Sequence, residues 1–187
     1  GEVKALVGSR GNSSDDSLDR ASNYPRQPGS TMKPLAVYTP ALDNGYTLAS
    51  PIDDVPFYNE NGDLWPRNVY RGYKGIRTLR NSVELSINTA AVKTLQDISI
   101  STSMKYLERF GLINKDNPSN DFFITKKENA KDNDDNLGLA LGGLTKGFSP
   151  LGMTAAYGAI ANDGVYIEPI VYTKVLNNKD ETILENI

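Results

Sequence analysis

The sequence predicts an α/β domain that is mostly helical, with a smaller share of strand toward the two ends of the chain. Helix patterns recur through the middle of the 187 residues, whereas short apolar runs with strand character lie at 3–7 and 165–184. A chain of this length buries roughly 70% of its extended surface on folding, which is enough for one domain with its own core.

The two strand-like segments predict different structures. Residues 3–7 largely alternate between apolar and polar side chains and stop at Gly8, as a single strand would, and a polar loop is expected at 12–19. Because the chain opens inside this strand, we expect it to be a fragment of a longer protein. Residues 165–184 are expected to form a hairpin that turns at 177–180, where the sequence reads Asn-Asn-Lys-Asp.

Helical patterns bounded by caps or breakers predict four helices, at 78–85, 89–97, 101–110 and 151–161. The last is the best marked, because Ser149 can cap it, Pro150 takes its first position and Gly164 follows its end. Its glycines and alanines permit close packing, so we expect this helix to be central and buried. Two long segments remain: 44–75 is expected to be an ordered irregular excursion, and 114–136 a surface loop whose charges face water.

Composition excludes several kinds of function. The net charge is −3 and no basic stripe is present, which argues against a nucleic-acid partner. The absence of cysteine rules out disulfides, thiolate catalysis and Cys-type zinc sites. Asp53 and Asp54 are adjacent carboxylates, but without histidine or further clustered acids they predict no metal site, and no cofactor is expected. No apolar stretch is long enough to cross a bilayer, so any membrane anchor is expected outside this chain.

Ser30 and Lys33, three residues apart, form the first candidate catalytic pair. A serine hydroxyl is a poor nucleophile unless a base removes its proton, and that base is usually histidine. The chain contains no histidine. A lysine can take this role when burial or a neighbouring positive charge keeps its amine neutral.

The residues around this pair predict a turn that runs directly into a helix. Gly29 permits a tight turn, Ser30 can take the first helical position, and Pro34 falls in the first turn, where a missing N–H is tolerated. Residues i and i+3 share a helix face, so the hydroxyl and the amine can meet where the helix dipole favours an anion. We expect the helix to reach residue 42, with Pro40 bending or ending it. The alternative is an N-cap serine followed by a solvated lysine.

Ser86 and Asn88 form a second pair of polar side chains, at the turn between two expected helices. A hydroxyl and a carboxamide two residues apart can both project from one tight turn into a shared cleft. The alternative is that one of them simply caps the helix expected from residue 89.

Ser-x-x-Lys at a helix start, followed by Ser-x-Asn at an inter-helical turn, resembles the penicillin-recognising acyltransferases. Within that group the likeness is to the transpeptidase domain of class A (bifunctional) penicillin-binding proteins, and it runs almost from end to end in the family's order. It rests on these further segments: Arg26-Gln27-Pro28-Gly29, Tyr38-Thr39-Pro40-Ala41-Leu42, Ile52-Asp53-Asp54, Trp65-Pro66-Arg67-Asn68, Thr78-Leu79-Arg80 and Leu141-Gly142-Gly143-Leu144-Thr145-Lys146-Gly147-Phe148-Ser149-Pro150-Leu151.

The resemblance implies a peptidoglycan DD-transpeptidase, a serine acyltransferase that cross-links stem peptides and is inhibited by β-lactam antibiotics. Ser30 would attack the carbonyl between the two terminal D-alanines of a stem peptide and form an acyl-enzyme, while Lys33 would accept its proton. Ser86 would pass a proton toward the leaving amine, and Asn88 would hold the substrate backbone and Lys33. The backbone N–H of Ser30 would supply half of an oxyanion hole.

The family also implies a location and further domains. Its members work on the extracytoplasmic face of the bacterial cell membrane, so an anchor and an upstream glycosyltransferase domain are expected outside this chain. The implied fold is the penicillin-binding-protein/β-lactamase-like transpeptidase fold, in which a helical subdomain packs beside a sheet.

One family motif, the Lys-Thr-Gly of an edge strand, is missing. Thr145-Lys146-Gly147 has the same residue types in another order, and we expect it to be a loop before a helix. Residues 1–187 are therefore expected to be a partial transpeptidase domain, with the helical subdomain and the first part of the sheet. Such a fragment is expected to be catalytically impaired when alone, and a complementary C-terminal fragment on a second chain would restore it.

Two other functions stay open at this point. A β-lactamase or penicillin-sensing domain shares the Ser-x-x-Lys chemistry, but no Glu-x-x-Leu-Asn element that could activate a deacylating water follows Ser86. The other alternative is a non-catalytic fragment that binds peptidoglycan or a partner protein. The presence of all four site side chains argues against it.

Overall fold

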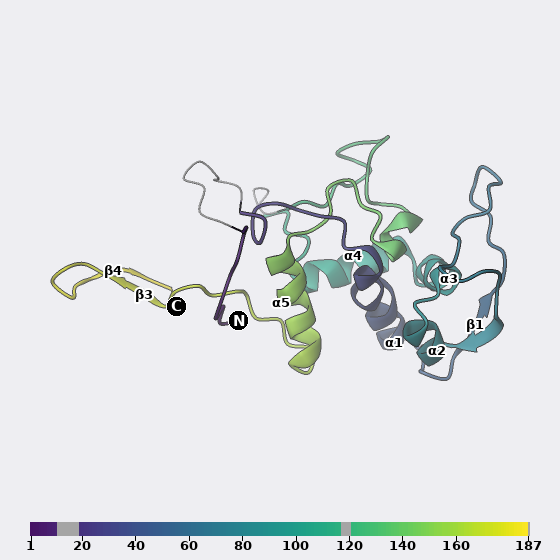
Figure 1. Cartoon of the computed structure of the whole chain (residues 1–187), viewed down its shortest axis with the longest axis horizontal. Helices are drawn as coiled ribbons and strands as arrows, with labels where there is room; N and C mark the ends of the chain where they lie inside the picture. The colour runs from purple at the N-terminus through teal and green to yellow at the C-terminus, as the bar shows by residue number, and fades with distance from the viewer. Residues whose placement is uncertain (11–18, 117–120, 187) are drawn as a thin grey trace.

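The computed structural model describes residues 1–10, 19–116 and 121–186, so most of the loop expected at 12–19 lies outside the described residues. The described residues form a group of helices with two short antiparallel sheets (Figure 1). In chain order the elements are η1 (Gly29–Thr31), η2 (Pro34–Tyr38), α1 (Thr39–Asp43), β1 (Pro51–Asp54), β2 (Gly75–Thr78), α2 (Leu79–Glu84), α3 (Asn88–Ile98), α4 (Ile100–Arg109), η3 (Leu137–Leu141), α5 (Pro150–Ala161), β3 (Lys174–Leu176) and β4 (Thr182–Glu185).

The helix expected near residue 30 is present and continues through Pro40 to Asp43, but its hydrogen bonding changes along its length. It opens as a 3₁₀ turn (η1), passes through a π-helical segment (η2) and ends as an α-helix (α1). Pro40 has no N–H to offer the carbonyl of Ala36, four residues before it. The hydroxyl of Ser103 in α4 donates to that buried oxygen instead, at 2.6 Å.

The core lies where this helical run packs against α3, α4 and η3. The helices expected at 78–85, 89–97 and 101–110 are present as α2, α3 and α4, each with boundaries within one residue of the prediction. The fully buried apolar side chains of the core include Met32, Leu35, Val37, Ala91, Leu95, Leu107 and Leu139. This packing buries Met32 before Lys33 and Leu35 after it.

The segment 44–75, expected to be irregular throughout, contains a short strand. Within it, residues 51–54 form strand β1, which pairs antiparallel with β2 beginning at Gly75; Pro51 lies opposite Thr78 and Asp54 opposite Gly75. Residues 44–50 and 55–74 lie outside the strands, as expected. Ile52 and Asp54 of β1 point inward and are buried. The polar member of this pair, Asp54, is the unusual one, because a buried carboxylate needs hydrogen-bond partners.

The two ends of the chain follow the sequence prediction only in part. The strand expected at 3–7 is wrong: the segment meets residue 170 through an isolated bridge, with Val3 N donating to Ile170 O at 2.9 Å. The expected hairpin is confirmed, with β3 paired to β4 around a turn at 177–180, although its strands are shorter than predicted. In Figure 1 this hairpin extends away from the helices.

Helix α5 begins as predicted but is not buried as predicted. Ser149 Oγ accepts a hydrogen bond from Gly152 N at 3.1 Å, and Pro150 is the first helical residue. Within α5, however, only Ala156 and Ala159 are buried. Part of the remaining surface lines an apolar groove of about 630 Å³ together with residues 1–6. Small side chains permit close packing, but they bury a helix only where another element covers it.

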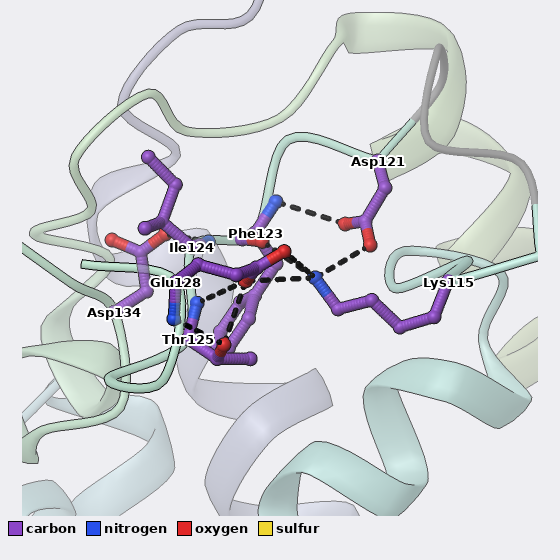
Figure 2. A network of polar contacts seen from close by, with 7 residues as sticks. All are labelled: Lys115, Asp121, Phe123, Ile124, Thr125, Glu128 and Asp134. Atoms are coloured by element: carbon purple, nitrogen blue, oxygen red, sulfur yellow. Dashed lines mark hydrogen bonds and ion pairs between the residues drawn. The ribbon is translucent and has the colours of Figure 1, made fainter.

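In the described part of the loop at 114–136, several charged side chains form ion pairs and hydrogen bonds with one another. The ammonium of Lys115 forms ion pairs with Asp121 at 2.8 Å and with Glu128 at 3.2 Å (Figure 2). Hydrogen bonds from the hydroxyl and the N–H of Thr125, together with Lys115, lower the pKa of Glu128 to about 2. The expectation that these charges simply face water is therefore wrong for this cluster.

Asp134 connects the same loop to the segment that follows it. Its side chain is buried and accepts hydrogen bonds from the N–H groups of Ile124 at 2.8 Å and Thr145 at 2.6 Å. A carboxylate that accepts from two backbone donors holds two chain segments at a fixed separation. Asp134 thereby ties the charged loop to residues 141–148, which pack beside Ser30.

Candidate active site

Lys33 is the centre of the site, because its side chain is buried and its amine reaches the turn between α2 and α3. Only 2% of the residue is exposed. The Nζ atom lies 2.7 Å from Ser86 O, 3.0 Å from Ser86 Oγ and 2.6 Å from Asn88 Oδ1. No acidic side chain of the described residues forms an ion pair with it. This burial excludes a solvated surface lysine. It also lowers the pKa of Lys33 to about 8.

The partners of this amine limit how a neutral Lys33 can bond. A neutral amine has two N–H donors and one lone pair. The carbonyl oxygens of Ser86 and Asn88 can only accept, so they take the two N–H groups. The lone pair is then left to accept from a hydroxyl, either that of Ser86 or that of Ser30.

Ser86 reaches Lys33 with both its carbonyl and its hydroxyl because of an unusual backbone conformation. Its φ angle is 51°, in the left-handed region that residues other than glycine seldom adopt. Holding a non-glycine residue there costs on the order of 1–3 kcal/mol. The two hydrogen bonds to Lys33, together with the bond from Ser86 N to Val83 O at 3.0 Å, favour this conformation.

Neither Ser86 nor Asn88 caps helix α3, so the capping alternative for these residues is wrong. Ile87 stands at the N-cap position and its side chain cannot accept a hydrogen bond. The first two amides of the helix, those of Asn88 and Thr89, instead donate to Asn68 Oδ1 at 2.9 and 3.4 Å. A residue twenty positions earlier thus supplies the cap.

Because the cap comes from elsewhere, the side chain of Asn88 is available to the site. Its Nδ2 donates to the carbonyl of Arg67 at 2.7 Å, and its Oδ1 accepts from Lys33 Nζ. The two ends of the carboxamide are therefore both engaged, which fixes its orientation.

Ser30 lies in η1, three residues before Lys33, and its side chain is exposed. The chain stays helical from Ser30 to Lys33, so the two residues share one face of the helical run. Within the described part of the chain, Ser30 Oγ forms no hydrogen bond, which means that it does not act as a helix cap. The structure thus brings Lys33, Ser86 and Asn88 into direct contact and places Ser30 one helical turn away.

The turn that carries Ser30 is held from its other side by residues 141–148. Arg26 and Phe148 exchange both of their backbone hydrogen bonds, each at 3.0 Å. The side chain of Gln27 bonds both backbone groups of Leu144, accepting from its N–H at 2.7 Å and donating to its carbonyl. The expectation that Thr145-Lys146-Gly147 forms a loop is confirmed, and this loop supports the turn before Ser30.

A glycine pair and a tyrosine complete this support. Gly142 has a φ of 67° and packs so closely on the turn that a Cβ atom would lie 2.3 Å from Gly29 O. From α5, the hydroxyl of Tyr157 donates to the carbonyl of Thr31 at 2.8 Å. The turn that carries Ser30 is therefore held on two sides, by residues 141–148 and by Tyr157 of α5.

Sequence reasoning did not assign Asn68 a function. The signal that could have found it was the absence of any capping side chain at Ile87, directly before a well-marked helix. Such a gap indicates that a distant polar residue must satisfy the first amides. It does not indicate which one.

Comparison with known proteins decides the family. The model of the penicillin binding protein transpeptidase domain matches residues 1–186 of this chain. The chain belongs to this family. Penicillin-binding protein 1A of Clostridium tetani is 35% identical over 198 residues, which cover 100% of this chain and 23% of that protein. The chain spans about a quarter of the length of the curated relatives that it matches.

Solved structures of penicillin-binding proteins share the fold. Penicillin-binding protein 1A from Haemophilus influenzae matches 91% of this chain and 23% of its own, with a TM-score of 0.71 and 29% identity. PonA1 from Mycobacterium tuberculosis, solved in complex with penicillin V, has a TM-score of 0.72 at 19% identity and covers 91% of this chain and 43% of its own. The second likeness shows the fold alone. Family and fold class are thus as the motifs indicated.

Two further observations concern metals and membranes. The described residues hold no group of three or more His, Cys, Asp or Glu side chains that could bind a metal ion. Across the same ranges, none of the helices combines the length and apolar character that a bilayer span requires.

Proposed function

We propose that this chain carries the nucleophile of a peptidoglycan DD-transpeptidase, a serine acyltransferase that acts on stem peptides ending in D-Ala-D-Ala. The observation that supports this most directly is the buried amine of Lys33, which has a pKa of about 8 and is held by Ser86 and Asn88 one helical turn from Ser30. An amine of this kind can be neutral near physiological pH, where it can serve as a general base.

In the first step, Ser30 Oγ attacks the carbonyl carbon of the penultimate D-alanine and its proton passes to the lone pair of Lys33. The resulting oxyanion accepts a hydrogen bond from the backbone N–H of Ser30, and one such donor typically contributes about 3 kcal/mol to catalysis. The bond to the terminal D-alanine then breaks. Its nitrogen takes up the proton from Lys33 through the hydroxyl of Ser86, which lies 3.0 Å from the amine.

In the second step, the amine of a neighbouring stem peptide attacks the acyl-enzyme. Its proton returns through the same groups to Ser30 Oγ, and a new amide cross-link is released. A β-lactam presents a reactive carbonyl of the same kind and would acylate Ser30. Because peptidoglycan is assembled outside the membrane, we place this activity on the extracytoplasmic face of the cell.

Labelling with a fluorescent penicillin tests this function in the complete gene product that carries the chain. We expect a covalent adduct that peptide mass spectrometry locates on Ser30, and we expect Ser30→Ala to abolish it. Thr31→Ala is the matched control, because it removes the neighbouring exposed hydroxyl and should leave the adduct in place. Residues 1–187 alone are expected to label more slowly.

The lifetime of the adduct separates this function from its alternatives. A transpeptidase is expected to hold the penicilloyl group for many minutes, whereas a β-lactamase would release it within seconds. Binding of peptidoglycan without any covalent labelling would indicate a non-catalytic domain and would contradict the proposal.

A further inference from the structure

The buried carboxylate of Asp54 ends a chain of hydrogen bonds that leads into the candidate active site, and the proposed mechanism does not use it. Asp54 is 0% exposed, and no cation of the described residues pairs with it. Its Oδ1 accepts from Asn68 Nδ2 at 2.7 Å and from Thr89 Oγ1 at 2.6 Å. Its Oδ2 accepts from Lys74 N at 2.7 Å and from the hydroxyl of Tyr70.

These four donors keep Asp54 ionised. Burial raises the pKa of the carboxyl, but the hydrogen bonds together outweigh burial, so the pKa lies below its ordinary value. An ionised carboxylate can only accept hydrogen bonds. Every group that contacts Asp54 must therefore turn a donor toward it.

This requirement fixes the orientation of Asn68. A carboxamide has an NH₂ end and a carbonyl end, and the NH₂ end of Asn68 faces Asp54. The carbonyl end consequently faces the start of α3, where it accepts from the amides of Asn88 and Thr89. If the carboxamide flipped, its NH₂ group would meet two N–H donors and its oxygen would meet the carboxylate.

The same logic continues to Lys33. The backbone of Asn88 is held by Asn68, and the side chain of Asn88 is held by the carbonyl of Arg67, so its oxygen is presented to Lys33 Nζ at 2.6 Å. The chain of contacts from Asp54 to the amine passes through one side chain, one backbone amide and one further side chain. Asp54 is fully buried, and Asn68 and Asn88 are partly buried.

We propose that Asp54 and Asn68 are positioning residues for this reaction. Through the cap on α3 they hold Asn88 in the orientation in which its oxygen accepts from Lys33, which leaves the lone pair of the amine for a serine hydroxyl. The inference rests on the proposed function and deepens it, because both residues act through Asn88 and do not touch the substrate.

The test measures the rate of Ser30 acylation by a penicillin as a function of pH in the complete gene product. Asn68→Ala is expected to lower the plateau rate at least tenfold. It is also expected to move the midpoint of the profile to lower pH, because the protonated amine loses an acceptor that favours it. Ser99→Ala is the matched control: Ser99 caps α4 at the far end of α3 and accepts from Thr102 N. The acylation rate of Ser99→Ala should stay within about twofold of the wild-type rate. The midpoint of its pH profile should stay within about 0.2 pH units of the wild-type midpoint.

Each outcome bears on a different claim. If the wild type forms no adduct at Ser30, the proposed function fails. If the wild type is acylated and Asn68→Ala keeps the wild-type plateau and midpoint, as Ser99→Ala does, this inference fails and the function stands.

If circular dichroism shows that Asn68→Ala does not fold, Asn68→Asp replaces it, because aspartate keeps an acceptor for the two amides and loses the donor to Asp54. An unchanged acylation rate in Asn68→Asp would overturn the inference in the same way.

Discussion

At Ser86 the demands of stability and of chemistry oppose each other. The left-handed backbone would suit glycine, yet glycine has no hydroxyl, and the Ser86 hydroxyl lies 3.0 Å from Lys33 Nζ. The same turn directs the carbonyl of Ser86 to the amine at 2.7 Å. A strained residue in contact with a candidate base indicates that the strain serves the site.

Two substitutions at Ser86 separate strain from chemistry. Ser86→Gly relieves the backbone, whereas Ser86→Ala retains the strain, and both remove the hydroxyl. We expect the glycine variant to have a free energy of unfolding about 1 kcal/mol higher than the alanine variant, measured by urea denaturation. Both should acylate about equally slowly. Equal stability of the two variants would show that the left-handed conformation is not retained in solution.

At the scale of elements, the helical run that carries Lys33 depends on α4. Pro40 leaves the carbonyl of Ala36 without its usual donor, and the hydroxyl of Ser103 replaces it at 2.6 Å in the core. Ser103→Ala removes this donor from a buried carbonyl. We expect a loss of about 1–3 kcal/mol in the free energy of unfolding.

Ser101 provides the control for this prediction, because it is exposed on the same helix. Ser101→Ala should change the unfolding free energy by less than about 0.5 kcal/mol. If both alanine variants unfold at the same denaturant concentration, the role assigned to Ser103 is refuted.

The contact between the loop at 141–148 and the turn before Ser30 is tested by two adjacent glycines. Gly142→Ala places a Cβ atom 2.3 Å from Gly29 O at a φ of 67°, so the turn must move. Gly143→Ala meets its nearest atom at 3.7 Å and needs no such change. We expect Gly142→Ala to slow acylation of Ser30 at least tenfold, because even a small displacement of a reacting group lowers the rate by about this much.

Gly143→Ala should be acylated at close to the wild-type rate when both variants are measured by stopped-flow with a fluorescent penicillin. Equal rates in the two glycine variants would mean that the loop does not position the nucleophile.

The elements that sequence predicted best are those whose signals are local. Ser149 and Pro150 mark the start of α5, and a serine and a lysine three residues apart on one helix can be read from spacing alone. The pairing of β1 with β2 was missed because twenty residues separate the two strands and each is only four residues long. Short strands without an adjacent turn carry little sequence signal.

At the scale of the whole molecule, the site is assembled from segments far apart in the chain. The turn at 26–33, the residues 67–68, the turn at 86–88 and the loop at 141–148 meet around Lys33 and Ser30. Helix α3 lies at their centre, because it packs on β1, on η2 and on η3. The packing of the core around α3 therefore brings these segments together, and no single motif contains all the residues of the candidate site.

Motif order revealed the family, but long-range partners could not be read from it. Asn68 and Asp54 both belong to segments that resemble the family, yet nothing in their local sequence says that one caps α3 and the other orients the cap. The burial of α5 was predicted wrongly for a similar reason, since its cover depends on what packs against it. Sequence patterns specify what a segment can do, and the tertiary fold decides which of these possibilities is used.

In the proposed mechanism a neutral Lys33 activates Ser30, and the pH dependence of acylation tests this role most directly. We predict that the acylation rate of the wild-type protein rises about tenfold per pH unit up to a midpoint near pH 8 and is level above it, because burial lowers the pKa of Lys33 to about 8. Lys33→Met should be slower by about 10²–10⁴-fold and should lack this titration. A wild-type profile that shows no midpoint near pH 8, or a methionine variant that acylates as fast as the wild type, would contradict the account.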